Sequence, residues 1–133
     1  MSDVPDLELS LPARADNVAL VRHALSAFVT EIGMGAARVA DVLLAVTEAC
    51  ANAVVHAYEG KQGGPLLVSA RTSGDELVVG VRDHGRGMRP RIDSPGLGLG
   101  LPVIMSLSDA VEIRPASDGR GGTEVTMRFR VAG

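Results

Sequence analysis

The stretch that decides the fold is Leu43 to Tyr58, with the sequence LLAVTEACANAVVHAY. Its apolar residues recur at helical spacing, and they predict a largely buried helix from about Ala37 to Ala57. Within it, Glu48 and Asn52 lie four residues apart, so their side chains project from one side of the helix. A carboxylate and an amide placed in this way suit the binding of a divalent cation or of a reacting oxygen.

Three glycine-containing motifs follow this helix. The segment 79–87, VGVRDHGRG, predicts a strand that runs into an Asp-x-Gly-x-Gly turn beginning at Asp83. The segment 96–101, GLGLGL, predicts a glycine-rich entry into another helix, and Gly121-Gly122-Thr123 predicts a turn before the last strand. A single glycine-rich loop would be weak support for any function, because such loops occur in several nucleotide-binding folds.

The rest of the chain predicts short strands and two further helices. Alternating apolar and polar residues indicate strands, and a helical stripe that follows Asp16 or Asn17 as a cap and stops at Gly33 indicates the first helix. The strands are expected at 6–11, 66–71, 76–83, 111–114 and 123–131, and the third helix at 99–107. This order predicts an α+β two-layer sandwich, in which three helices cover one face of a mostly antiparallel mixed sheet. We expect residues 1–133 to form one domain.

Composition excludes several classes of protein. Aromatic residues make up only 2% of the chain and the formal net charge is −3, which argues against direct nucleic-acid binding through stacking or phosphate contacts. The single cysteine, Cys50, fits a reducing compartment and is expected to be a packing thiol. The N-terminus lacks the pattern of a signal peptide and no apolar run is long enough to span a bilayer, so a cytoplasmic protein is expected.

Lys61 is the only lysine, and no GxxxxGK[ST] motif occurs. A P-loop nucleotide site is therefore excluded. No group of Cys and His residues has zinc-binding spacing, so no metal is indicated beyond one that accompanies a nucleotide.

In their order and spacing, the Glu-x-x-x-Asn motif, the Asp-x-Gly-x-Gly motif and the later glycine motifs resemble the GHKL superfamily of ATP-binding domains. That superfamily is named after gyrase, Hsp90, histidine kinases and MutL. In particular, the chain resembles the small bacterial anti-sigma factors that are also serine/threonine kinases, over nearly its whole length. The resemblance implies a Bergerat-type, histidine-kinase-like ATPase fold with ATP and Mg²⁺ as cofactors.

The helix that opens the motif set carries three candidate residues. The resemblance implies that Glu48 is catalytic and positions the attacking hydroxyl, and that Asn52 is the Mg²⁺ ligand beside the phosphates. The alternatives are a solvent-facing glutamate and an asparagine bonded to a neighbouring loop. His56 lies one turn further on, where packing or capping of the helix end is an alternative to a phosphate contact.

Asp83 at a strand end is the candidate for recognising adenine, because a carboxylate accepts a hydrogen bond from the N6 amine but opposes the O6 of guanine. A plain turn aspartate is the alternative. The resemblance also implies that Thr123 lies beside Asp83, and that the glycine-rich helix entry faces the phosphates. The full set of expected nucleotide contacts is Asn52, His56, Asp83, Gly85, Gly87, Gly96, Gly98, Leu99, Gly100, Leu101 and Thr123.

The resemblance implies a protein that binds a sigma factor of RNA polymerase and phosphorylates a serine of a STAS-type anti-anti-sigma protein, and that forms a homodimer. Two alternatives remain open at this point. One is an ATP-binding anti-sigma module that transfers no phosphate, and the other is a detached catalytic domain of a histidine kinase. Ala51 departs from the family pattern, in which a hydroxyl residue often precedes the asparagine.

Overall fold

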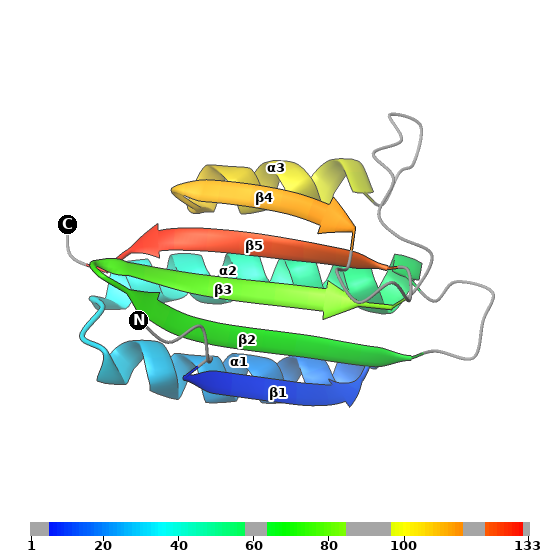
Figure 1. Cartoon of the computed structure of the whole chain (residues 1–133), viewed down its shortest axis with the longest axis horizontal. Coiled ribbons are helices and arrows are strands. Elements are labelled where there is room, and N and C mark those ends of the chain that lie inside the picture. The colour runs from blue at the N-terminus through cyan, green and yellow to red at the C-terminus, as the bar shows by residue number, and fades with distance from the viewer. Residues whose placement is uncertain (1–5, 58–63, 85–96, 116–121, 132–133) are drawn as a thin grey trace.

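In the computed structural model, the described residues are 6–57, 64–84, 97–115 and 122–131. They form five strands, three α-helices and one π-helical turn (Figure 1). In chain order these are β1 (Leu7–Pro12), α1 (Ala15–Glu31), α2 (Ala36–Asn52), the π turn η1 (Ala53–Ala57), β2 (Pro65–Ser73), β3 (Glu76–Asp83), α3 (Leu97–Leu107), β4 (Ala110–Pro115) and β5 (Thr123–Arg130).

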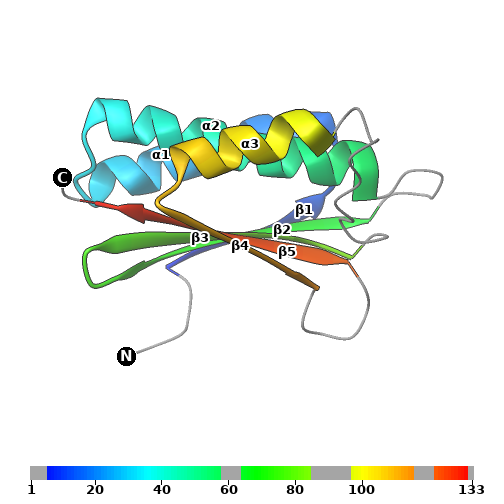
Figure 2. The same ribbon diagram turned by 90° about the horizontal axis from the view of Figure 1, so that it is seen from above.

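The molecule has two layers. The strands form one sheet in the order β1-β2-β3-β5-β4, and the three helices all lie on one face of it (Figure 2). The predicted α+β sandwich is confirmed, with one refinement. All four strand pairings are antiparallel, so the described sheet is not mixed.

The core lies between the two layers and is built from aliphatic side chains. On α1 the residues Val21, Leu25 and Val29 are fully buried, as the helical stripe predicts. On β5 the residues that alternate toward the helices, Val125, Met127 and Phe129, are buried as well. The other face of the sheet carries mainly polar side chains, which is typical of an antiparallel sheet with one wet face.

Cys50 lies in this core. It is fully buried, and burial raises the pKa of its thiol from 9.0 to about 12. A neutral thiol surrounded by apolar side chains acts as a small packing group, which confirms the prediction from sequence. Among the described helices, none has the length and apolar character needed to cross a membrane.

Two element boundaries differ from prediction for clear local reasons. The first helix begins at Ala15, and neither Asp16 nor Asn17 caps it. The Asn17 amide instead donates to the Pro12 carbonyl, at 2.8 Å, which joins the helix to the end of β1. The second helix is not regular to Ala57, because α-helical bonding ends at Asn52 and η1 follows.

Arg38 holds the sandwich together at the end where α2 begins. Its guanidinium donates to the Leu107 carbonyl at 3.0 Å, pairs with Asp41 at 3.3 Å and with Asp109, and lies 5.3 Å from the centre of the Phe129 ring. One side chain thus connects α2 with the end of α3, the turn into β4, and β5. Asp109 also accepts a hydrogen bond from the backbone N–H of Arg130, at 2.7 Å.

This arrangement makes stability depend on pH. The hydrogen bond from the Arg130 N–H is the largest effect and lowers the pKa of Asp109 below its usual 3.8; desolvation opposes it, and the charge and hydrogen bond of Arg38 add to the lowering. Because the pKa is lower in the folded state, the carboxylate stabilises the fold above the usual aspartate pKa. That contribution is lost as the pH falls through the folded-state value.

We therefore expect Asp109→Asn to lower the free energy of unfolding by about 0.5–1 kcal/mol at pH 7, since the site is partly exposed. The difference from wild type should shrink toward zero as the pH falls below 3.8 and through the lower folded-state pKa. Urea titrations at several pH values measure it, with Asp75→Asn in the exposed β2–β3 turn as control. A deficit that stays constant over this range would contradict the assignment.

Candidate functional site

The predicted site residues gather at one end of the sandwich. The end of α2 with η1, the end of β3, the start of α3 and the start of β5 all lie at this end (Figure 1). The structure also places η1 and β3 in contact. Motifs that are separated by up to about seventy residues in the sequence are thereby brought to a common region.

Glu48 and Asn52 occupy the last two turns of α2. Glu48 is half-buried, whereas Asn52 is only 6% exposed. Among the described residues, the Asn52 Nδ2 atom is buried and has no hydrogen-bond partner. A buried N–H donor without an acceptor lowers the stability of the fold, so the Asn52 Nδ2 atom indicates an acceptor outside the described protein atoms.

The π turn η1 begins directly after Asn52. A π turn widens the helix and breaks the regular i to i−4 bonding, and such turns occur frequently at functional sites. His56 lies in this turn; the structure describes its backbone but not its side chain. Its expected role therefore stays a prediction.

The start of α3 lies level with Glu48. The Arg38–Leu107 hydrogen bond fixes one point where the antiparallel helices α2 and α3 lie side by side (Figures 1 and 2). Both helices rise by about 1.5 Å per residue, so Glu48, ten residues after Arg38, and Leu97, ten residues before Leu107, lie at about the same height. The free N–H groups of the first turn of α3 are thus near the catalytic candidate.

The helix begins at Leu97, two residues before the predicted start. Gly98, Leu99, Gly100 and Leu101 are therefore all helical. The N–H groups of the first helical turn have no acceptor within the helix. They can therefore donate to a bound anion, such as a phosphate. The Leu101 side chain is partly buried and packs against the core.

Asp83 and Thr123 form a second pair at this end. They are directly opposite each other in the β3–β5 ladder, and both side chains are buried, with exposed fractions of 6% and 4%. Both lie on the face of the sheet that carries the core residues Val81 and Val125, so they face the helical layer. The expected proximity of Thr123 to Asp83 is therefore seen in the strand register.

Gly122 makes this pairing possible. Its φ is +99°, and a Cβ atom at this position would lie 2.0 Å from the Asp83 carbonyl oxygen and 2.7 Å from the His84 Cα. No side chain fits such a space, so only glycine lets β5 begin against the end of β3. The sequence offered a signal in the paired glycines before Thr123, but the backbone that Gly122 approaches is visible only in the structure.

Several predicted residues are not covered. Gly85, Gly87 and Gly96 lie outside the described residues. Besides the residues of α3, four predicted residues are placed, and they form two pairs, Glu48 with Asn52 on α2 and Asp83 with Thr123 on the sheet. Both pairs lie at the same end of the molecule, as expected for one site.

These residues fit a magnesium nucleotide. Among the described residues, no cluster of three or more His, Cys, Asp or Glu side chains is present to hold a metal by protein ligands alone. Mg²⁺ usually takes only one or two protein ligands and completes its shell with phosphate oxygens and water. The Asn52 side chain offers an amide oxygen of the kind that Mg²⁺ takes, while its Nδ2 atom, which has no partner among the described residues, is left to donate a hydrogen bond.

Comparison with known proteins identifies the family. Residues 11–129 match the family described as the histidine kinase-like ATPase domain. The chain is 31% identical to the anti-sigma F factor of Clostridium acetobutylicum, covering 95% of this chain and 94% of that one. It is 32% identical to the serine-protein kinase RsbW of Bacillus pumilus, covering 88% and 83%.

Solved structures share the fold. A crystal structure of the RsbU and RsbW domains of a Mycobacterium tuberculosis protein aligns with a TM-score of 0.74 and 27% identity, over 96% of this chain and 32% of that longer chain. The histidine kinase domain of a blue-light activated kinase from Erythrobacter litoralis aligns with a TM-score of 0.60 and 24% identity, over 92% of this chain and 62% of that one. The second similarity concerns the fold alone.

The contact at Gly122 leads to a test. We expect Gly122→Ala to lower the free energy of unfolding by more than about 2 kcal/mol, because it adds a clash with backbone atoms to the usual cost of positive φ. Gly33→Ala is the matched control, since Gly33 has φ +96° but no atom within 4 Å of its Cβ position. It should cost only about 1 kcal/mol.

Urea unfolding of both variants measures the difference. If the two substitutions destabilise the protein equally, the close approach of Gly122 to Asp83 does not constrain the site.

Proposed function

The chain belongs to the family of histidine kinase-like ATPase domains, and we propose that it is an ATP-dependent serine/threonine protein kinase that also acts as an anti-sigma factor. The family expected from the motifs is thereby confirmed, whereas the activity and its residues are our proposal. The main support for the proposed activity is that the Glu48–Asn52 pair and the Asp83–Thr123 pair lie at the same end of the sandwich. The similarity to an anti-sigma F factor and to a serine-protein kinase supports it.

Asp83 and Thr123 would hold the adenine. In this proposal the Asp83 carboxylate accepts a hydrogen bond from the adenine N6 amine, and Thr123 supports the same edge of the ring. Both side chains are buried, so a purine bound there is shielded from water and its hydrogen bonds are strengthened. A guanine would place its O6 against the carboxylate, which selects ATP over GTP.

The phosphates would then extend toward α2 and the start of α3. Asn52 would hold the Mg²⁺, which supplies charge neutralisation for the phosphate oxygens. The N–H groups of the first turn of α3 would bind phosphate, and Gly85, Gly87 and Gly96 are proposed to line the same site with backbone contacts. His56, one turn beyond Asn52, is proposed to contact the nucleotide as well.

Glu48 would act on the attacking group. The substrate serine Oγ forms a bond to the γ-phosphorus while the bond from that phosphorus to the β–γ bridging oxygen breaks, and ADP leaves. The serine proton passes to the Glu48 carboxylate. Phosphoryl transfer needs mainly positioning and charge stabilisation, so no covalent intermediate on the protein is required.

The name of one relative, anti-sigma F factor, supports a sigma factor as a partner of this chain. We propose that it binds a sigma factor of RNA polymerase, and that its phosphorylation substrate is a serine of a STAS-type antagonist protein. We further propose a cytoplasmic homodimer with no direct contact to nucleic acid. The net charge of −3 agrees with regulation through a protein partner, because a DNA-binding surface would carry positive charge.

Recognition of adenine is tested by Asp83→Asn. Loss of the charged acceptor should weaken ATP binding by ten- to hundredfold, the equivalent of about 1.5–3 kcal/mol for a hydrogen bond to a charged group. Calorimetric titration with ATP and with GTP measures both affinity and selectivity. Glu124→Gln is the control, because Glu124 adjoins Thr123 in β5 but points to the opposite face of the sheet. Equal binding of ATP and GTP by the wild type would contradict the proposed role of Asp83.

Catalysis is tested by Glu48→Ala. We expect transfer of γ-phosphate to the STAS partner to fall at least about a hundredfold, the usual contribution of a general base, while ATP affinity changes less than about threefold. Asp41→Ala, two turns earlier on the same side of α2, is the control. A wild type that binds ATP but transfers no phosphate would leave only an anti-sigma module that uses ATP as a switch.

A further inference from the structure

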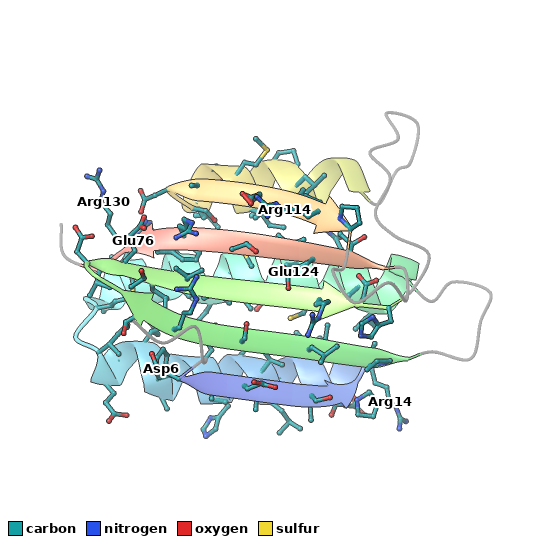
Figure 3. All side chains as sticks on the ribbon, viewed as in Figure 1. Asp6, Arg14, Glu76, Arg114, Glu124 and Arg130 are labelled. Carbon is teal, nitrogen blue, oxygen red and sulfur yellow. The ribbon has the colours of Figure 1, made fainter. Side chains whose placement is uncertain are left out.

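The wet face of the sheet, which points away from the helices, contains a hollow of about 220 Å³. It extends over β1, β2, β3 and β5, on the face that Figure 3 views. Polar and charged residues form most of its lining, which includes Glu8, Leu67, Ser69, Gly80, Arg82 and Glu124. The helices cover the opposite face of the sheet (Figure 2), so this hollow is separate from the candidate nucleotide site.

Gly80 leaves the space of the hollow open. It lies in the interior of β3, between Ser69 on β2 and Thr126 on β5. Its φ is not positive, so the backbone conformation does not require glycine at this position. A Cβ atom would lie 3.1 Å from the Ser69 Oγ, a contact that rotation of the hydroxyl can relieve. A glycine inside a strand weakens the strand, and it often marks a place where a ligand approaches the backbone.

Arg82 brings a positive charge into the hollow. Its Nε atom is buried and has no hydrogen-bond partner among the described residues. The ion pairs between described residues on the wet face join Glu112 to Arg114 and Glu76 to Arg128, and neither includes Arg82. A buried donor without an acceptor lowers the stability of the fold, and a guanidinium binds a carboxylate through paired hydrogen bonds. Arg82 therefore indicates a ligand that carries a carboxylate.

Two carboxylates lie on either side of Arg82. Glu124, which Figure 3 shows, is directly opposite Arg82 in the β3–β5 ladder, and Glu8 lies two strands away from Arg82 on β1. Three strand spacings of about 4.8 Å separate β1 from β5, so the backbones of Glu8 and Glu124 are about 15 Å apart. Across the strands, the charges of the hollow are thus negative, positive and negative.

The complementary ligand has one carboxylate and two cationic groups. A free basic amino acid has this pattern, with a carboxylate and an ammonium close together and a second cation at the end of a chain. Arg82 and Glu124 lie on adjacent strands and match the first two groups, while the more distant Glu8 matches the third. The hollow is smaller than the roughly 300 Å³ at which drug-sized sites begin, which suits a ligand of this size.

We propose that the hollow binds a free basic amino acid of the size and charge of lysine. Arg82 binds the α-carboxylate, Glu124 accepts hydrogen bonds from the α-ammonium, and Glu8 accepts hydrogen bonds from the side-chain ammonium. Gly80 gives the ligand room against the backbone of β3. This site goes beyond the proposed function, and it requires neither nucleotide binding nor phosphoryl transfer.

The test is calorimetric titration of the full chain with L-lysine, together with backbone-amide NMR. We expect saturable one-to-one binding with a Kd below about 1 mM, and the largest shift changes at Ser69, Gly80, Arg82 and Glu124. Cadaverine lacks the carboxylate, and Nα-acetyl-L-lysine lacks the α-ammonium. Each should bind at least about tenfold more weakly than L-lysine, because one charged hydrogen-bonding group is lost.

Three variants test the residues of the hollow. Arg82→Met keeps an apolar stem but removes the guanidinium, and Glu124→Gln removes a charge while leaving ATP affinity unchanged; each should weaken L-lysine binding at least about tenfold. Gly80→Ala should weaken it as well, since the methyl group takes up space in the hollow. Arg71→Met is the control, because Arg71 lies on β2 outside the lining. Circular dichroism shows whether each variant is folded.

The absence of saturable L-lysine binding up to about 10 mM would overturn the inference. Equal affinity for cadaverine would reduce the hollow to a site for cations, and equal affinity for Nα-acetyl-L-lysine would assign it to the last residue of a peptide; either result would overturn the inference too. So would binding that Arg82→Met leaves unchanged.

A titration with Mg²⁺ and ADP on the same samples separates this site from the proposed function. L-lysine should still bind at saturating nucleotide, and its displacement by ADP would overturn the inference. Binding of L-lysine by a protein that takes up no nucleotide would leave the hollow standing and contradict the proposed function.

Discussion

The site depends on the close contact between the start of β5 and the end of β3. Gly122 approaches the Asp83 carbonyl so closely that no other residue fits, and this approach fixes the register in which Asp83 and Thr123 face each other. Because both side chains are buried under the helical layer, they define a polar position at the edge of an otherwise aliphatic core. The remaining candidate groups are arranged around this pair.

One end of the sandwich is held by side-chain contacts between its layers, and the other contains the candidate site. At one end, Arg38 joins α2, α3 and β5 through a carbonyl, two carboxylates and an aromatic ring. At the other end, α2 passes into a π turn and α3 begins with a glycine-rich turn, and the Asn52 Nδ2 atom has no partner in the part of the chain that the structure describes. Local stability is commonly lower at ligand-binding ends than in the packed body of a domain. Arg38 fixes the C-terminal end of α3 through the Leu107 carbonyl. The first turn of α3 is thereby held at the height of Glu48 by a contact that lies outside the candidate site.

The sequence was sufficient for features that depend on regular periodicity. The α1 stripe and the alternation in β5 follow from simple burial, and the position of Glu48 and Asn52 on one side of α2 follows from helical spacing. Features that depend on contacts between distant residues were not predictable. Asn17 fails as a cap because it bonds Pro12, and the π turn after Asn52 has no sequence signature. The steric demand on Gly122 comes from Asp83, about forty residues away.

The central claim is that one end of the sandwich binds a magnesium nucleotide, and backbone-amide NMR of the wild-type protein titrated with Mg²⁺ and ADP tests it most directly. The account predicts that the largest shift changes occur at Asn52, Asp83, Thr123 and the first turn of α3. Amides near Arg38 and Asp109, at the opposite end, should change little. Shift changes confined to that opposite end or to the wet face of the sheet, or no change at saturating nucleotide, would contradict the account.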